Sequence, residues 1–108
     1  MADLIISNVV WKKGERGNQR LIIYDSDGTT KHNLTGHSYT FKFWKDGASS
    51  NKGSGSLTII DAVNGEAEYA VLITDTDTVN RYIGEIVETD TNLKTSTFAV
   101  EVLETAPA

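Results

Sequence analysis

The sequence predicts an all-β protein, an immunoglobulin-like antiparallel β-sandwich of about seven strands. Runs of β-branched and aromatic residues recur at intervals of roughly 8 to 12 residues, each bounded by Gly, Asn, Asp or Ser. The sequence also contains no capped stripe of apolar residues at the 3.6-residue period of a helix. Together these two observations favour paired strands and minimal helix.

Length and composition predict a single folded domain. The chain has 108 residues, of which 39% are hydrophobic and none is cysteine. A chain of this size can bury one core, and without cysteine its stability has to come from packing rather than from disulfides. We expect one domain over residues 1–108, with a core from about residue 4 to residue 104 and a frayed tail at 105–108.

The individual strands follow from local patterns. The clearest is an alternation in which Tyr39, Phe41 and Phe43 are separated by polar residues. Because successive side chains of a strand point to opposite faces, the three rings are expected on one buried face. The expected strands are residues 4–11, 20–24, 38–45, 57–61, 66–73, 81–89 and 93–103.

A tight hairpin is predicted in the middle of the chain. Asn64-Gly65 is a pair that favours a tight hairpin, so residues 57–61 and 66–73 should pair antiparallel. Alternation in the second of these strands predicts which side chains face the core. They are Ala67, Tyr69, Val71 and Ile73.

Two further connections have recognisable compositions. The turn Asp90-Thr91-Asn92 is expected to join strands 81–89 and 93–103 into a second hairpin. In the last strand Phe98, Val100 and Val102 should be buried. Residues 46–55 are rich in Gly, Ser and Asn, and we expect them to form a mobile loop.

The charge distribution excludes several classes of partner. The formal net charge is -5, and the largest basic cluster is Lys12-Lys13, so no surface is expected to attract nucleic acid. No segment approaches the roughly 20 apolar residues of a membrane span, so no membrane contact is expected. The first residues lack the pattern of a secretion signal, which leads us to expect synthesis in the cytoplasm.

Residue types and spacings give no catalytic centre, and we predict that the protein is not an enzyme. The serines occur in loop-like sequence without a Gly-x-Ser-x-Gly elbow, and no pair of acids is selected for hydrolysis. His32 and His37 are the only histidines, and zinc would require carboxylates brought from elsewhere in the fold. We therefore predict no metal site and no cofactor.

Two groups of acidic residues contain the oxygen ligands that calcium prefers. The order Asp25-Ser26-Asp27-Gly28 does not fit a calcium loop and is more typical of a plain turn. A second group occurs in loops that meet at one end in some sandwiches, where carboxylates hold calcium. Its members are Asp75, Asp77 and Asp90, and solvated loop acids are the commoner outcome.

The two tryptophans and one lysine are the candidate interface residues. Trp44 falls on the face opposite Tyr39, Phe41 and Phe43, where an aromatic ring can anchor a partner. Trp11 and Lys42 complete this candidate set. The plainer alternative is that Trp44 covers the edge of the sheet beneath the loop at 46–55.

A series of turn and strand motifs follows in a recognisable order along the chain. The motifs are Asp27-Gly28, Asn33-Leu34-Thr35-Gly36, Tyr39-Thr40-Phe41-Lys42-Phe43, Ile60-Asp61, Asn64-Gly65, Glu68-Tyr69, Arg81-Tyr82-Ile83-Gly84-Glu85-Ile86 and Thr97-Phe98-Ala99-Val100-Glu101-Val102. Their order resembles the N-terminal domain of phage upper baseplate proteins, over roughly residues 4 to 104. The resemblance implies an immunoglobulin-like sandwich that mounts other parts of a phage tail through protein contacts, with no catalytic residue to carry over.

We therefore expect a structural protein of a virion, a tail or baseplate adaptor that binds other virion proteins or copies of itself. A capsid or tail decoration protein is one alternative. A carbohydrate-binding or adhesin-like module is another, in which Trp44 or Trp11 stacks on a cell-surface sugar and loop acids hold calcium.

Overall fold

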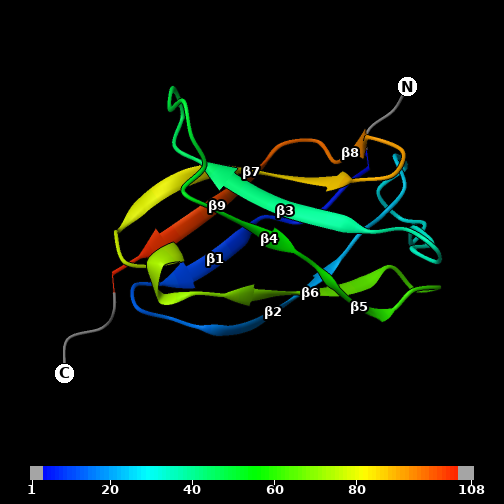
Figure 1. Cartoon of the computed structure of the whole chain (residues 1–108), viewed down its shortest axis with the longest axis horizontal. Coiled ribbons are helices and arrows are strands. Elements are labelled where there is room, and N and C mark those ends of the chain that lie inside the picture. Colours follow the sequence, from blue (N-terminus) through cyan, green and yellow to red (C-terminus); the bar gives the residue numbers. More distant parts are fainter. Residues whose placement is uncertain (1–3, 105–108) are drawn as a thin grey trace.

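The structure, a computed structural model, describes residues 4–104 and forms two packed β-sheets (Figure 1). The predicted frayed tail at 105–108 lies outside the described residues. The larger sheet has the order β1-β9-β7-β3-β4, and β8 also pairs with β7. Its strands are β1 (Val9–Lys12), β9 (Phe98–Leu103), β7 (Asn80–Glu88), β3 (Tyr39–Trp44), β4 (Gly53–Ser56) and β8 (Leu93–Lys94).

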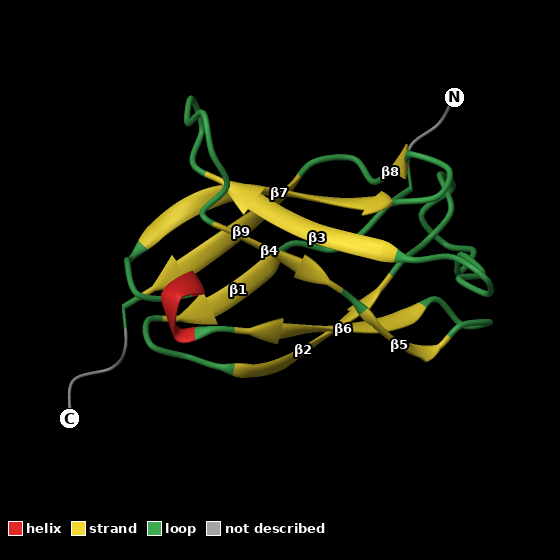
Figure 2. Cartoon of the chain, viewed as in Figure 1, coloured by secondary structure: helices red, strands yellow, loops and turns green. Residues whose placement is uncertain are grey.

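The smaller sheet has the order β2-β6-β5 and covers one face of the larger one (Figure 1). Its strands are β2 (Gly17–Ile22), β6 (Glu66–Val71) and β5 (Thr58–Asp61). A 3-10 turn, η1 (Ile73–Asp75), is the one helical segment of residues 4–104 (Figure 2). No helix in the described part of the chain is long and apolar enough to cross a membrane.

The predicted all-β sandwich is confirmed, with nine strands in residues 4–104 instead of about seven. The strand pairing is not purely antiparallel, because β1 pairs with β9 in parallel. The expected strand at 4–11 is shortened to β1, and before it Leu4 and Ile5 form only isolated bridges. The expected last strand is divided into β8 and β9.

The segment predicted as a mobile loop, residues 46–55, is partly a strand. Its second half enters β4, which pairs antiparallel with β3. The prediction was wrong there because the Gly-Ser sequence has low strand propensity, whereas β3 offers a row of backbone groups to pair with. The first half does form a connection, which projects from the sheet between β3 and β4 (Figure 1).

The core is a cluster of aromatic rings between the two sheets. Tyr39, Phe41 and Phe43 are each at most 1% exposed, as their alternation predicted. Phe41 stacks on Tyr69 of the smaller sheet with ring centroids 4.6 Å apart, and Trp11 lies 5.5 Å from Phe43. These contacts join β1, β3 and β6 across the sandwich.

Glycines make room for these rings. Gly84 lies opposite Phe43 on one side and Phe98 on the other. A Cβ atom at Gly84 would lie 2.6 Å from the Phe98 ring and 2.8 Å from Val100. The aromatic cluster therefore requires a residue without a side chain at this inward position of β7.

The predicted pairing of the central hairpin is confirmed, but its turn is longer than the Asn64-Gly65 pair, because β5 ends at Asp61 and β6 begins at Glu66. β5 and β6 pair antiparallel, and Gly65 in the turn has a φ of 68°, a conformation that favours glycine. Ala67, Tyr69 and Val71 are buried. Ile73 was predicted to join them but is 54% exposed, because β6 ends at Val71 and the chain turns into η1.

The variant Gly84→Ala tests the fit of the aromatic cluster. We expect it to lower the free energy of unfolding by about 1–3 kcal/mol, because the added methyl group overlaps Phe98 and Val100. Urea unfolding measures the loss. The matched control is Gly55→Ala, whose Cβ would lie 3.2 Å from the Tyr69 ring and should be better tolerated. Equal stability of Gly84→Ala and the wild type would contradict the argument.

Candidate functional site

The outer face of the larger sheet carries a short row of apolar side chains. Trp44 of β3 lies opposite Ile83 of β7, which in turn lies opposite Ala99 of β9. All three side chains are partly exposed. This row arises because the alternation that buries Phe41 and Phe43 directs the neighbouring positions outward.

Charged pairs flank the row. Lys42 lies opposite Glu85, with Nζ 3.8 Å from Oε1, and Arg81 lies opposite Glu101, with Nε 3.6 Å from Oε1. Each pair joins two neighbouring strands on the outer face. We use the name Trp44 face for the outward side chains of the row and its two charged pairs. They are Lys42, Trp44, Arg81, Ile83, Glu85, Ala99 and Glu101.

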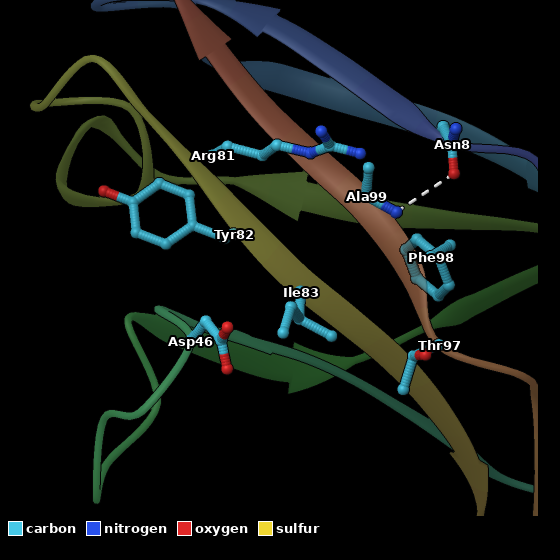
Figure 3. Close-up of a pocket in the computed structure, with 8 residues that line it drawn as sticks. All are labelled: Asn8, Asp46, Arg81, Tyr82, Ile83, Thr97, Phe98 and Ala99. Atoms are coloured by element: carbon cyan, nitrogen blue, oxygen red, sulfur yellow. Dashed lines mark hydrogen bonds between the residues drawn. The ribbon is translucent and has the colours of Figure 1, made fainter.

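Two hollows adjoin the Trp44 face. One, of about 370 Å³, lies between Trp44 and the β3–β4 connection and is lined there by Ser49, Ser50 and Asn51. The other, of about 550 Å³, is lined by Ile83 and Ala99 among others. Figure 3 shows this second hollow, with Asp46 on the connection and the Asn8 side chain accepting a hydrogen bond from the Ala99 N–H.

Of the three predicted interface residues, Trp44 and Lys42 lie together on the outer face, but Trp11 does not. Trp11 is 1% exposed and packs against Phe43 and Tyr69. Its indole N–H donates to the Gln19 side-chain oxygen at 3.0 Å. Trp11 was therefore wrongly predicted as an interface residue, because the sequence did not reveal that β1 directs it between the sheets.

The three acids of the candidate calcium site, Asp75, Asp77 and Asp90, do not lie together. Asp75 and Asp77 precede β7, whereas Asp90 follows it, so the nine-residue strand separates them (Figure 1). Asp75 is buried and accepts hydrogen bonds from the Tyr69 hydroxyl at 2.7 Å and the Leu72 N–H at 2.9 Å. Asp77 pairs with the Lys52 ammonium. The alternative of a shared calcium site is therefore wrong.

The two histidines converge on a residue that the sequence reasoning missed, Glu88 at the end of β7. Glu88 is 3% exposed. His32 Nε2 lies 3.1 Å from Glu88 Oε2, and His37 Nδ1 lies 3.6 Å from Glu88 Oε1. Asp25 contacts the other ring nitrogen of His32, with Oδ1 2.7 Å from Nδ1. Asp90 contacts the same nitrogen of His37 that faces Glu88, with Oδ2 2.6 Å from Nδ1.

Hydroxyl groups complete this cluster. The Tyr39 and Thr91 hydroxyls each donate to Glu88 at 2.5 Å. Burial, followed by the bond to Glu88, raises the pKa of Tyr39. Burial also acts to raise the pKa of Glu88, but the bonds from Thr91, Tyr39 and His32 outweigh it and the pKa is lowered. The carboxylate is therefore kept charged inside the protein.

His37 and Asp90, on the exposed side of the cluster, also shift each other's pKa. The hydrogen bond with Asp90 raises the pKa of His37, and the same bond lowers the pKa of Asp90. In the described part of the chain, no serine side chain hydrogen-bonds to either histidine. The cluster can hold protons or a cation, and the hydroxyl groups paired with it are those of Tyr39 and Thr91.

No protein-family model matches the sequence, and no curated protein matches it.

Asp27 shows why the segment at 25–28 forms a plain turn. Its Oδ1 accepts the N–H groups of Thr29 and Thr30 at 2.9 and 2.8 Å, and its Oδ2 accepts the Thr30 hydroxyl at 2.5 Å. The hydroxyl bond is the main cause that lowers the pKa of Asp27 from 3.8 to about 2. The carboxylate is thus occupied by its own turn.

The variant Thr30→Val tests this interaction. Removing the hydroxyl should raise the pKa of Asp27 part of the way from about 2 towards 3.8, while the two N–H bonds remain. Because the folded pKa lies below the unfolded value, the stabilisation is present above pH 3.8 and is lost as the pH falls through about 2. NMR titration of the Asp27 carboxyl carbon measures the shift.

The comparison variant for this titration is Thr29→Val, which keeps the Thr30 hydroxyl. The Thr29 side chain is the weakest of the groups that lower the pKa of Asp27, so this variant should raise that pKa less than Thr30→Val does. An unchanged pKa of Asp27 in Thr30→Val would show that the Thr30 hydroxyl does not stabilise the charged carboxylate.

Proposed function

We propose that this protein is a non-catalytic structural module of a virion, of the tail or baseplate type, and that it binds protein partners through the Trp44 face. The observation that carries the proposal is the row formed by Trp44, Ile83 and Ala99 on three paired strands. Aromatic and aliphatic side chains presented by a rigid sheet are suited to anchoring a protein interface.

The charges beside the row favour a second copy of the chain as one partner. Lys42 and Arg81 are basic, whereas Glu85 and Glu101 are acidic, so both signs occur on one face. A surface with both signs can complement itself when two copies meet about a symmetry axis. The resemblance to phage baseplate domains supports a symmetric virion as the setting.

Carbohydrate binding is a second candidate, favoured by one observation. The hollow of about 370 Å³ places Trp44 beside Ser49, Ser50 and Asn51. An indole ring can stack on a sugar, and hydroxyl and amide groups can hydrogen-bond its hydroxyls. The two candidates predict different binding partners for the same tryptophan.

The variant Trp44→Ala tests both. We expect the wild type to form a closed oligomer. Trp44→Ala should raise the dissociation constant of this oligomer by about tenfold or more, because an interface anchor is lost. Light scattering across a concentration series measures the mass of each protein. Trp44→Phe keeps an aromatic ring and should retain part of the association.

The control is Val63→Ala, at a 67% exposed position in the β5–β6 turn of the other sheet, and it should associate like the wild type. Circular dichroism verifies that each variant is folded. A wild type that stays monomeric at every concentration would contradict self-association. Binding to a glycan array that Trp44→Ala abolishes would then support the carbohydrate candidate.

A further inference from the structure

The cluster around Glu88 brings together three side chains that can bind a metal ion, from separate segments of the chain. His37 precedes β3, Glu88 ends β7, and Asp90 lies in the turn between β7 and β8. Backbone hydrogen bonds hold these segments in place. The His37 N–H donates to Leu34 at 3.2 Å, the Thr89 N–H to Ser38 at 2.8 Å, and the Asn92 N–H to Glu88 at 2.7 Å. The side chains therefore start from fixed backbone positions.

The donor atoms of this cluster are close enough to share one ion. His37 Nδ1, one Glu88 oxygen and one Asp90 oxygen all lie within 4.8 Å of one another. Zinc binds nitrogen and oxygen at about 2.0–2.2 Å, which places tetrahedral ligands about 3.4 Å apart. The 3.6 Å from His37 Nδ1 to Glu88 Oε1 matches this separation. The 2.6 Å from His37 Nδ1 to Asp90 Oδ2 is a direct hydrogen bond, which an ion would replace as the exposed Asp90 side chain rotates.

The orientation of Glu88 also suits a ligand. Its Oε2 is held by the Tyr39 hydroxyl and by His32 Nε2, so the carboxylate cannot turn freely. Its Oε1 accepts the Thr91 hydroxyl at 2.5 Å and lies 3.6 Å from His37 Nδ1, and a carboxylate oxygen has a second lone pair for an ion. Hydrogen bonds that orient a ligating carboxylate are typical of metal sites. Asp25 in turn orients His32 through Nδ1.

The charge of the cluster favours a cation. It contains three carboxylates, and in residues 4–104 none of them forms an ion pair with lysine or arginine. Among the described residues, the basic side chains in contact with them are His32 and His37. The side chains of His37 and Asp90 are 33% and 47% exposed, so solvent reaches the outer side of the cluster. A divalent ion can enter there and offset the negative charge of the buried Glu88.

We propose that His37 Nδ1, Glu88 and Asp90 bind a divalent metal ion of the zinc class, with water in the remaining position. The imidazole nitrogen separates this site from calcium sites, which use oxygen ligands. The ion joins the loop before β3 to the β7–β8 turn at the end of the sandwich. This proposal does not depend on the proposed function, because the Trp44 face contributes no ligand.

Isothermal titration calorimetry of metal-free, untagged protein with Zn²⁺ measures the affinity and the number of zinc sites. We expect one saturable site and a rise in melting temperature when zinc is present. His37→Ala and Asp90→Asn should each weaken the zinc affinity by more than about tenfold, because each removes a ligand. Ca²⁺ in place of Zn²⁺ should not bind with comparable affinity.

The matched control is Asp77→Asn, an exposed acid at the other end of β7, which should bind zinc like the wild type. NMR of the wild type provides a second readout, because zinc should shift the ring signals of His37. Absence of a saturable zinc site would overturn the proposal. Unchanged zinc affinity in both folded ligand variants would overturn it as well.

Discussion

The packing of aromatic rings between the two sheets is the constraint on which the rest of the structure depends. Phe41 stacks on Tyr69 across the sandwich, and Trp11 packs on Phe43, so β1, β3 and β6 are held in one register. A shift of β3 by one residue would turn Phe41 and Phe43 towards solvent. The fixed register places Trp44 on the outer face. The candidate interface is thus a consequence of the core.

The same alternation explains how a glutamate comes to be buried. The inward positions of β7 are occupied in turn by Tyr82, Gly84, Ile86 and Glu88. Glu88 lies opposite Tyr39, whose hydroxyl supplies one of the hydrogen bonds that a buried carboxylate requires. His32 and Thr91 supply others. The polar cluster therefore begins where the aromatic core ends, along the same two strands.

Much of the fold could be predicted because its signals are local. Alternation at Tyr39, Phe41 and Phe43 and the Asn64-Gly65 turn depend on neighbouring residues, and both predictions are confirmed. β4 was missed because its Gly-Ser sequence forms a strand only when β3 lies beside it. Glu88 was missed for a similar reason, since its partners His32 and Tyr39 are 56 and 49 residues away in sequence. Trp11 was misplaced because the face that β1 buries is set by its pairing with β9.

The two candidate sites lie at opposite ends of one strand. β3 carries Tyr39, which contacts Glu88, at its start and Trp44 at its end. Six residues of strand separate the two ends by roughly 17 Å, beyond the distance at which substitutions usually couple. Surface changes at one site should therefore leave the other unaffected. Changes to Phe41 or Phe43, which lie between them, would disturb both, because the aromatic core positions the two ends together.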